Sequence, residues 1–210
     1  MRLRRNWPGE AELPDMPGVI KADPASFRND PALSLNDVPI QIEIGSGKGD
    51  FIIAMASKHP RVSFFGIEKA PTVMYIAARK NQKRPLPNLR FLSVDARELD
   101  LFFGGGRAER IYLNFSDPWP KNRHEPRRLT SAGMLKVYRE ILTPGGNLQL
   151  KTDQESFFDY SLKMLIHEGW SVGKMTKDLH RSADEANIIT EYEHRFLLLG
   201  QPIYRLEAWT

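Results

Sequence analysis

The fold is decided by the stretch Ile111-Tyr-Leu-Asn-Phe-Ser-Asp-Pro-Trp-Pro-Lys121. Its first half alternates and is apolar, which predicts a β-strand. Pro118 and Pro120 lack a backbone N–H donor and fix φ, so the chain must leave the sheet near Asp117. A carboxylate, an indole and an ammonium then meet at the carboxyl end of a strand, where ligands bind in open α/β sheets. Taken alone, the stretch is equally consistent with a proline-rich turn that happens to contain an acid.

Strand and helix patterns alternate along the rest of the chain. Strand patterns cover residues 40–44, 62–67, 89–94, 110–115, 147–152, 169–175 and 203–209. Helical patterns cover residues 51–58, 71–80, 131–142 and 154–167, and a last helix runs from Thr190 to a stop at Gly200. This alternation predicts an α/β fold with a mostly parallel seven-stranded sheet and helices on both faces. The last strand is expected to be antiparallel, at the end of the sheet.

The length of 210 residues suggests one domain, which we place at residues 38–210. Residues 1–37 contain many prolines and little periodicity, so they predict an N-terminal arm that lies on the domain or is partly disordered.

Composition excludes several classes of protein. The chain has no cysteine, so it has no disulfide framework or thiolate chemistry, and a reducing, cytoplasmic setting is expected. No apolar segment follows Arg2, Arg4 and Arg5 as a signal peptide would require, and no apolar run is long enough to cross a membrane. No metal site is predicted.

Basic residues are clustered more than the net charge of +4 suggests. They gather at residues 2–5, 79–84 and 121–128, which suits a phosphate-bearing partner. Solvated helix ends and loops produce similar runs, and for residues 79–84 that simpler interpretation is favoured.

A glycine-rich turn, Glu43-x-Gly45-x-Gly47-x-Gly49, closes the strand at residues 40–44. Glycines let a backbone approach a ligand closely, and the following helix offers free N–H groups. A dinucleotide fingerprint would need its third glycine at Asp50, and no Gly-Lys-Ser/Thr phosphate loop is present. The turn instead resembles the first motif of class I S-adenosylmethionine-dependent methyltransferases, which implies a Rossmann-like fold and S-adenosylmethionine as cofactor.

Acidic residues follow consecutive strands in the order that this resemblance requires. Glu68 ends the second strand, where an acid can accept from both ribose hydroxyls, and Asp95 ends the third, where it could accept from the adenine amino group. The resemblance places Glu43 opposite the methionine ammonium. It implies a cofactor pocket lined by Glu43, Gly45, Gly47, Glu68, Asp95 and Asp117. Taken alone, Glu68 and Asp95 are each better explained as helix-capping or loop acids, and it is the register of three acids with the glycine turn that favours a cofactor.

Four motifs together resemble the bacterial tRNA (guanine-N7)-methyltransferase family. They are the glycine turn, Phe115-Ser-Asp-Pro-Trp-Pro-Lys121, Lys151-Thr-Asp153 and Thr190-Glu-Tyr-Glu193, and the resemblance spans roughly residues 40–209. The proline loop is also similar to the Asp/Asn-Pro-Pro-Tyr loop of amino-methylating enzymes, but Trp119 and Pro120 replace its second proline and aromatic. In the tRNA family the target is a guanine in the tRNA variable loop, so tRNA is the expected partner of a monomer or homodimer.

The resemblance also implies residue roles. Asp117 is the expected catalytic residue, and the expected substrate contacts are Lys121, Asp153, Thr190, Glu191, Tyr192 and Glu193. The basic loop would contact RNA through Arg123, His124, Arg127 and Arg128, although surface charge explains the loop almost as well and His124 is expected to be merely exposed. A contact between the N-terminal arm and RNA is also expected. A capping box explains Thr190 and Glu193 without any ligand.

The chemistry of this target fits the residues. Guanine N7 carries a lone pair and no proton, so no base is needed to deprotonate it. We expect Asp117 to orient the guanine by accepting from N1–H and the exocyclic amine, and to stabilise the cation that forms. Two alternatives stay open at this point: a methyltransferase acting on an exocyclic amine or a small molecule, and a non-enzymatic RNA-binding module.

Overall fold

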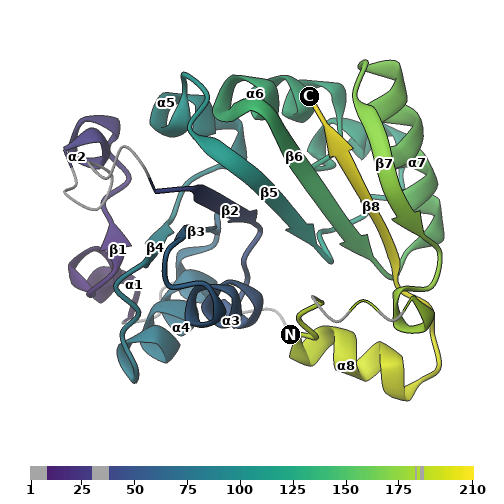
Figure 1. Ribbon diagram of the computed structural model, residues 1–210. Helices are drawn as coiled ribbons and strands as arrows, with labels where there is room; N and C mark the ends of the chain where they lie inside the picture. Colours follow the sequence, from purple (N-terminus) through teal and green to yellow (C-terminus); the bar gives the residue numbers. More distant parts are fainter. Residues whose placement is uncertain (1–8, 30–37, 183, 185–186) are drawn as a thin grey trace. The chain divides into compact units, whose positions relative to one another are not determined.

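The computed structural model describes residues 9–29, 38–182, 184 and 187–210, which Figure 1 traces from end to end. The chain divides into two compact units, Met1–Phe102 and Phe103–Thr210. Within the described residues, no helix is long and apolar enough to cross a membrane.

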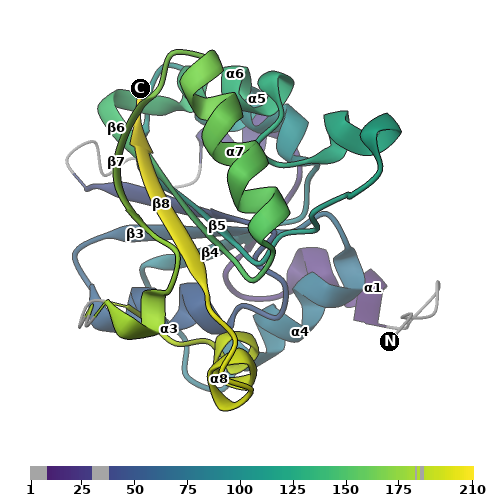
Figure 2. The same cartoon turned by 90° about the vertical axis from the view of Figure 1, so that its right-hand side faces the viewer.

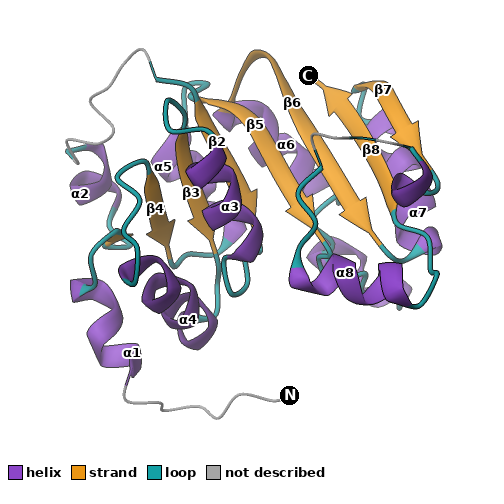
Figure 3. Ribbon diagram, turned by 60° about the horizontal axis from the view of Figure 1, so that its bottom comes forward, coloured by secondary structure: helices purple, strands orange, loops and turns teal. Residues whose placement is uncertain are grey.

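The first unit is built on a parallel sheet with the strand order β1-β4-β3-β2. Its strands are β1 (Val19–Ile20), β2 (Ile40–Ile44), β3 (Ser63–Ile67) and β4 (Leu89–Leu92). The register pairs Ile44 with Ile67 and Ile67 with Leu92, so the carboxyl ends of three strands are level. Two helices, α3 (Asp50–Lys58) and α4 (Pro71–Gln82), lie on one face of this sheet (Figure 3). The unit ends with the 3-10 turn η3 (Ala96–Glu98) and the start of α5 (Leu99–Phe103).

Residues 9–29 of the predicted arm pack onto this unit. They form α1 (Gly9–Glu12), η1 (Leu13–Asp15), β1 and α2 (Pro24–Arg28). The Phe27 side chain is completely buried, with its ring centroid 5.9 Å from that of Phe65 and 5.3 Å from that of Phe102. The strand β1 adds to the seven that were predicted, because two residues are too few to show a period. Arg2, Arg4 and Arg5 lie outside the described residues.

The second unit is built on a mixed sheet with the strand order β5-β6-β8-β7. Its strands are β5 (Ala108–Asn114), β6 (Leu142–Thr152), β7 (Ser171–Thr176) and β8 (Tyr204–Trp209). Figure 2 shows α6 (Ala132–Ile141) and α7 (Glu155–His167) along the same face of this sheet. The helix α8 (Glu191–Leu198) lies at the end toward which the β6 arrow points (Figure 3). The short turns η4 (Asn122–Arg127) and η5 (Leu179–Arg181) complete the unit.

The last strand is antiparallel, as predicted, but its predicted place at the end of the sheet is wrong. β8 pairs antiparallel with both β6 and β7, so β7 is the edge strand. Pairing across a sheet depends on residues far apart in the chain, which a local pattern does not show. In the folded protein β8 buries Tyr204, Leu206 and Ala208, as an inner strand does, whereas β7 is mostly exposed, as an edge strand is.

Candidate functional site

The glycine turn after β2 is fastened to the end of β3. The N–H groups of Gly45 and Ser46 both donate to the carbonyl oxygen of Ile67, at 2.8 and 2.9 Å. Gly45, Gly47 and Gly49 have φ values of 74°, 55° and 78°, which side chains rarely adopt. The turn therefore needs glycine at all three positions before any ligand is considered.

Gly47 and Gly49 differ in what surrounds them. A Cβ atom added to Gly47 would meet no atom of the described residues within 4 Å, whereas one added to Gly49 would lie 2.9 Å from Cβ of Ala77 in α4. Gly49 thus allows α3 and α4 to pack closely. Gly47 leaves open space beside the turn, at the start of a helix whose first N–H groups have no intrahelical partner.

Glu68 braces this turn as well as ending β3. Its Oε2 accepts from the N–H of Gly47 at 3.2 Å, and its Oε1 accepts from the N–H of Ala70 at 2.9 Å. Glu68 therefore does act as a loop acid, because it accepts hydrogen bonds from two backbone N–H groups of the surrounding loops. Each carboxylate oxygen can accept a second hydrogen bond, so the same side chain retains acceptors for a ribose diol.

Asp95 is engaged by two cationic side chains. Its oxygens accept from Nε and Nη2 of Arg97, at 3.0 and 2.7 Å, and from Nζ of Lys69 at 2.6 Å. Arg97 first, and then Lys69, holds the pKa of the Asp95 carboxyl well below its usual range. Asp95 also caps η3 by accepting from the N–H of Arg97. Its predicted contact with an adenine amino group stays a prediction, and any such contact would share the carboxylate with these donors.

These residues fit the chemistry of S-adenosylmethionine. Glu43 is 3% exposed and lies at the carboxyl end of β2, where its charge suits an ammonium group. Glu68 suits a diol, and the open side of Gly47 leaves room for a ligand against the backbone.

In the second unit, Asp117 lies in the loop after β5 and is exposed. Two residues of this loop, Phe115 and Trp119, have positive φ values of 52° and 41°, which are uncommon for residues other than glycine. Their strain indicates that the surrounding structure dictates the path of this loop. The prediction that Asp117 also lines the cofactor pocket stays a prediction.

Arg128 holds the proline loop in place. Its Nε donates to the carbonyl oxygens of Pro118 and Trp119, both at 3.2 Å, and its Nη2 donates to that of Trp119 at 3.0 Å. Its guanidinium lies 4.1 Å from the ring centroid of Tyr160 in α7. Arg128 was predicted to contact RNA. In the structure its Nε and Nη2 groups donate instead to backbone carbonyls of the loop that carries Asp117.

Tyr160 is itself fixed by Glu125, which accepts from its hydroxyl group. Burial and the neighbouring Glu125 carboxylate raise the pKa of the Tyr160 phenol above its usual range.

The indole of Trp119 is contacted from within the basic loop. The Arg127 guanidinium lies 5.0 Å from the Trp119 ring, and the His124 ring meets it edge-on at 5.5 Å. His124 was expected to be merely exposed; it is half-buried and accepts from Nε of Arg123 at 3.3 Å. Arg123, Arg127 and Lys121 are exposed, which leaves them accessible to a polyanion.

Tyr192 gathers with two acidic residues of this unit. The phenol pKa of Tyr192 is raised by burial first and then by the charges of Asp153 and Asp117, while Arg195 opposes the rise. Asp153 follows β6 directly and is half-buried, and Tyr192 is 48% exposed. The structure thus brings together three of the residues that were predicted from separate motifs: Asp117, Asp153 and Tyr192.

The Thr190–Glu193 motif is divided between two roles. Thr190 is the N-cap of α8, and its Oγ1 accepts from the N–H of Glu193 at 3.1 Å, as a capping box predicts. The Glu193 side chain is 0% exposed and accepts from Nζ of Lys151 at 2.8 Å. The side chain is therefore engaged within the protein, and its expected contact with substrate stays a prediction. The side chain of Glu191, which opens α8, lies outside what the structure describes.

Lys151 is a fully buried charged residue that the sequence patterns do not single out. It was noted only as part of the Lys151-Thr-Asp153 motif. The available signal is the place of Lys151 within the predicted strand 147–152, because a lysine that becomes buried in a sheet requires a partner.

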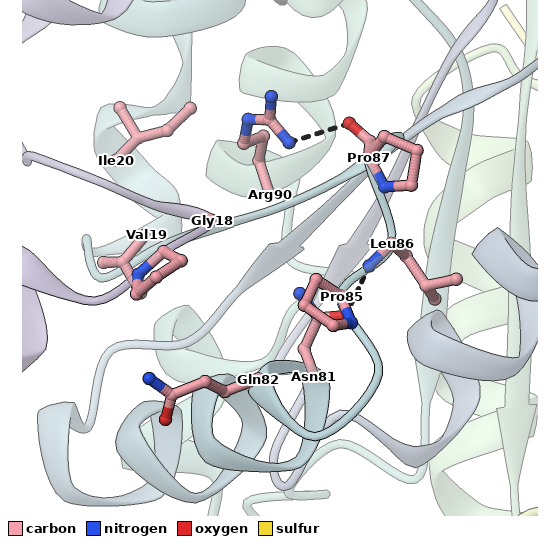
Figure 4. A pocket seen from close by; sticks show the side chains of 10 residues that line it. Gly18, Val19, Ile20, Asn81, Gln82, Pro85, Leu86, Pro87 and Arg90 are labelled. Atoms are coloured by element: carbon pink, nitrogen blue, oxygen red, sulfur yellow. Dashed lines mark hydrogen bonds between the residues drawn. The ribbon is translucent and has the colours of Figure 1, made fainter.

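Two cavities lie away from these residues. One of about 330 Å³ separates the arm from the loop after α4; Figure 4 shows Arg90 and Asn81 in its wall, each bonded to the backbone of that loop. The other, of about 430 Å³, lies beside β7, where Arg205 pairs with Asp184. Neither cavity contains a predicted site residue. Within the described residues, no group of three or more His, Asp or Glu side chains could hold a metal ion.

Comparison with known proteins identifies the family. Residues 37–206 match a family model described as "Putative methyltransferase". A protein named tRNA (guanine-N(7)-)-methyltransferase from Geobacillus thermodenitrificans (strain NG80-2) is 47% identical over 209 residues, which is 99% of this chain and 97% of that protein. The protein of the same name from Bacillus subtilis (strain 168) is 42% identical over 209 residues, covering 99% and 98%.

Solved structures share the fold at much lower identity. The 16S rRNA methyltransferase KamB is 16% identical with a TM-score of 0.65, over 88% of this chain and 92% of that one. A 16S rRNA (adenine(1408)-N(1))-methyltransferase mutant from Catenulisporales acidiphilia, solved with S-adenosylmethionine, is also 16% identical, with a TM-score of 0.63 over 90% and 91%. These likenesses confirm the predicted α/β methyltransferase fold, and the sequence relatives go further: the chain belongs to the tRNA (guanine-N(7)-)-methyltransferase family.

Proposed function

We propose that this protein transfers the methyl group of S-adenosylmethionine to N7 of a guanine in the variable loop of tRNA. The observation that carries the proposal is identity of 42–47% over nearly the whole chain to proteins named for this reaction. The structural support is a set of acids and a glycine turn at the carboxyl ends of β2 and β3, and a second set of acids after β5 and β6.

The cofactor would be held by residues of the first unit. Glu43 would face its ammonium, Glu68 would accept from its ribose hydroxyls, and Gly45 and Gly47 would let the backbone approach it. When bound, S-adenosylmethionine supplies an electrophilic methyl group on a sulfonium. The carboxylates fit a ligand that carries positive charge.

Asp117 would orient the guanine rather than deprotonate it. N7 is an acceptor with no proton to lose, so a general base has nothing to remove. A carboxylate that accepts from N1–H and the exocyclic amine would fix the plane of the base and direct N7 toward the methyl group. Its charge would also stabilise the cationic product, and such positioning contributes up to ~7–11 kcal/mol in well-oriented systems.

The tRNA backbone would bind to the exposed basic residues of the loop after Asp117. Lys121, Arg123 and Arg127 are all exposed, and such cations release counterions when they contact phosphates. Asp153, Thr190 and Tyr192 are the proposed contacts near the base. The proposed setting is the cytoplasm, where tRNA is available, and the protein would act as a monomer or homodimer.

The test is methylation of unmodified tRNA with methyl-labelled S-adenosylmethionine, followed by borohydride and aniline treatment, which cleaves the chain at N7-methylguanosine. We expect one cleavage site in the variable loop, and we expect tRNA binding to weaken steeply with salt. Label on an exocyclic amine or a small molecule would contradict the proposal. The absence of cofactor binding by calorimetry would leave only an RNA-binding module.

A further inference from the structure

A fully buried ion pair joins β6 to α8. Lys151 Nζ lies 2.8 Å from Oε2 of Glu193, and both side chains are 0% exposed. The ammonium also donates to Oδ1 of Asn187 at 3.1 Å and to the carbonyl oxygen of Ile188 at 3.2 Å, so each of its three hydrogens has an acceptor. Oε1 of Glu193 accepts from Nδ2 of Asn187 at 2.7 Å. Lys151, Glu193 and Asn187 therefore form a closed ring of hydrogen bonds.

This ring fixes one arrangement of the segment that opens α8. A buried charge is tolerated only while it is paired and hydrogen-bonded, and removing either partner leaves the other uncompensated. Any shift of Asn187, Ile188 or Glu193 away from β6 would break several of these bonds together. The Thr190 cap then ties the first turn of the helix to the same segment.

Lys151 is also connected to the loop that carries Asp117. It is paired in register with Asn114, the last residue of β5, and its carbonyl oxygen accepts from the N–H of Phe115 at 2.8 Å. The Phe115 ring lies 5.9 Å from Lys151 Nζ and 4.9 Å from the ring of Tyr192. One residue thus contacts the start of the loop through its backbone and the start of α8 through its side chain.

We propose that Lys151 is a positioning residue for methyl transfer, which acts through Glu193 and Asn187 to hold Tyr192 beside the Asp117 loop. The inference rests on the proposed function, because a reaction driven by alignment needs its acceptor-side residues held in one geometry. It also gives Glu193 a different role from the one expected. Glu193 serves as the partner of Lys151, and tRNA is contacted by its exposed neighbours.

The test compares Lys151→Met with two matched controls in the same unit. Lys177→Met removes an exposed lysine whose Nζ lies 3.1 Å from Oε1 of Glu155, with the two side chains 66% and 55% exposed. Leu165→Ala removes buried apolar volume from α7 without touching the ion pair. The measurements are kcat and KM for tRNA, the Kd for S-adenosylmethionine, and amide hydrogen exchange of residues 187–198.

We expect Lys151→Met to lower kcat/KM for tRNA at least 30-fold, to accelerate exchange of residues 187–198 at least tenfold, and to change the cofactor Kd less than threefold. Lys177→Met should match the wild type. Leu165→Ala should lower the melting temperature without the selective loss of tRNA turnover, which separates positioning from general stability. If Lys151→Met does not fold, Glu193→Gln should show the same pattern in weaker form, because an amide keeps one acceptor for Lys151.

Wild-type kcat/KM and exchange in both Lys151→Met and Glu193→Gln would overturn the inference. So would an equal loss of tRNA turnover in Leu165→Ala. If the wild type does not methylate tRNA at all, the proposed function fails. The exchange of residues 187–198 still decides in that case whether Lys151 holds α8.

Discussion

Two glycines of the same turn should fail in different ways when each is replaced by alanine. Gly47 and Gly49 both have positive φ, so an alanine at either position costs roughly 1–2 kcal/mol of stability from backbone strain. Their surroundings differ, and so the remaining consequences should differ. This contrast tests which part of the turn faces the cofactor.

Gly49→Ala should be the more destabilising change. Its Cβ would lie 2.9 Å from Cβ of Ala77 and 3.3 Å from Cδ1 of Ile53, and a Cβ atom cannot rotate away. Overpacking of this kind costs about 1–3 kcal/mol. Together with the backbone strain, the free energy of unfolding should fall by roughly 2–5 kcal/mol.

Gly47→Ala should mainly weaken the binding of the cofactor. In the part of the chain that the structure describes, no atom lies within 4 Å of its added Cβ, so only the backbone strain lowers stability. The methyl group would instead occupy the space that we assign to S-adenosylmethionine. A tenfold rise in the cofactor Kd corresponds to about 1.4 kcal/mol, and we expect at least that rise.

The assays are guanidinium unfolding for stability and calorimetry for the cofactor Kd, both at a temperature where each variant is folded. For Gly49→Ala we expect a large stability loss and a Kd within threefold of the wild type. Wild-type cofactor affinity in Gly47→Ala would refute the reasoning, as would equal stability losses in the two variants.

Three further changes test other parts of the account. Asp117→Ala should lower kcat/KM for tRNA by about 10²–10³-fold, as removal of one orienting or charge-stabilising group does elsewhere, with an unchanged circular dichroism spectrum because Asp117 is exposed. Lys121→Ala should weaken tRNA binding and reduce its salt slope by about 1, with cofactor affinity unchanged in calorimetry. Arg97→Met should lower the free energy of unfolding only slightly at pH 7, because Arg97 is 69% exposed and water screens its pairing with Asp95. Since the pKa of Asp95 is depressed only in the folded protein, this contribution exists above the unfolded pKa and fades as pH falls, so urea unfolding of the two proteins should converge toward about pH 2.

Much of the fold follows from local patterns. Short apolar segments in 40–44, 62–67 and 110–115 predict β2, β3 and β5, because these strands are largely buried in the sheet. The order of β7 and β8 does not follow, since pairing across a sheet depends on residues far apart in the chain. A run of six residues cannot show which strand will be covered on both edges.

The role of a site residue could be predicted where its partner is close in the sequence, and could not where its partner is far away in the chain. Thr190 caps α8 through a residue three positions away, which a sequence motif can reveal. Glu193 pairs with Lys151, which is 42 residues away on β6. The same motif therefore predicts the backbone cap at Glu193 but not the ion pair of its side chain. Arg128 illustrates the same point, because a run of cations does not show which of them a neighbouring carbonyl will bind.

The central claim is that alignment, with no proton removed from guanine, carries the methyl-transfer step. The most direct test is the single-turnover rate of tRNA methylation as a function of pH, measured with saturating cofactor and enzyme. Because N7 has no proton to remove, the rate constant should stay level from about pH 6 to 8.5. A rate that rises about tenfold per pH unit to a plateau would show that a base is being deprotonated and would contradict the account.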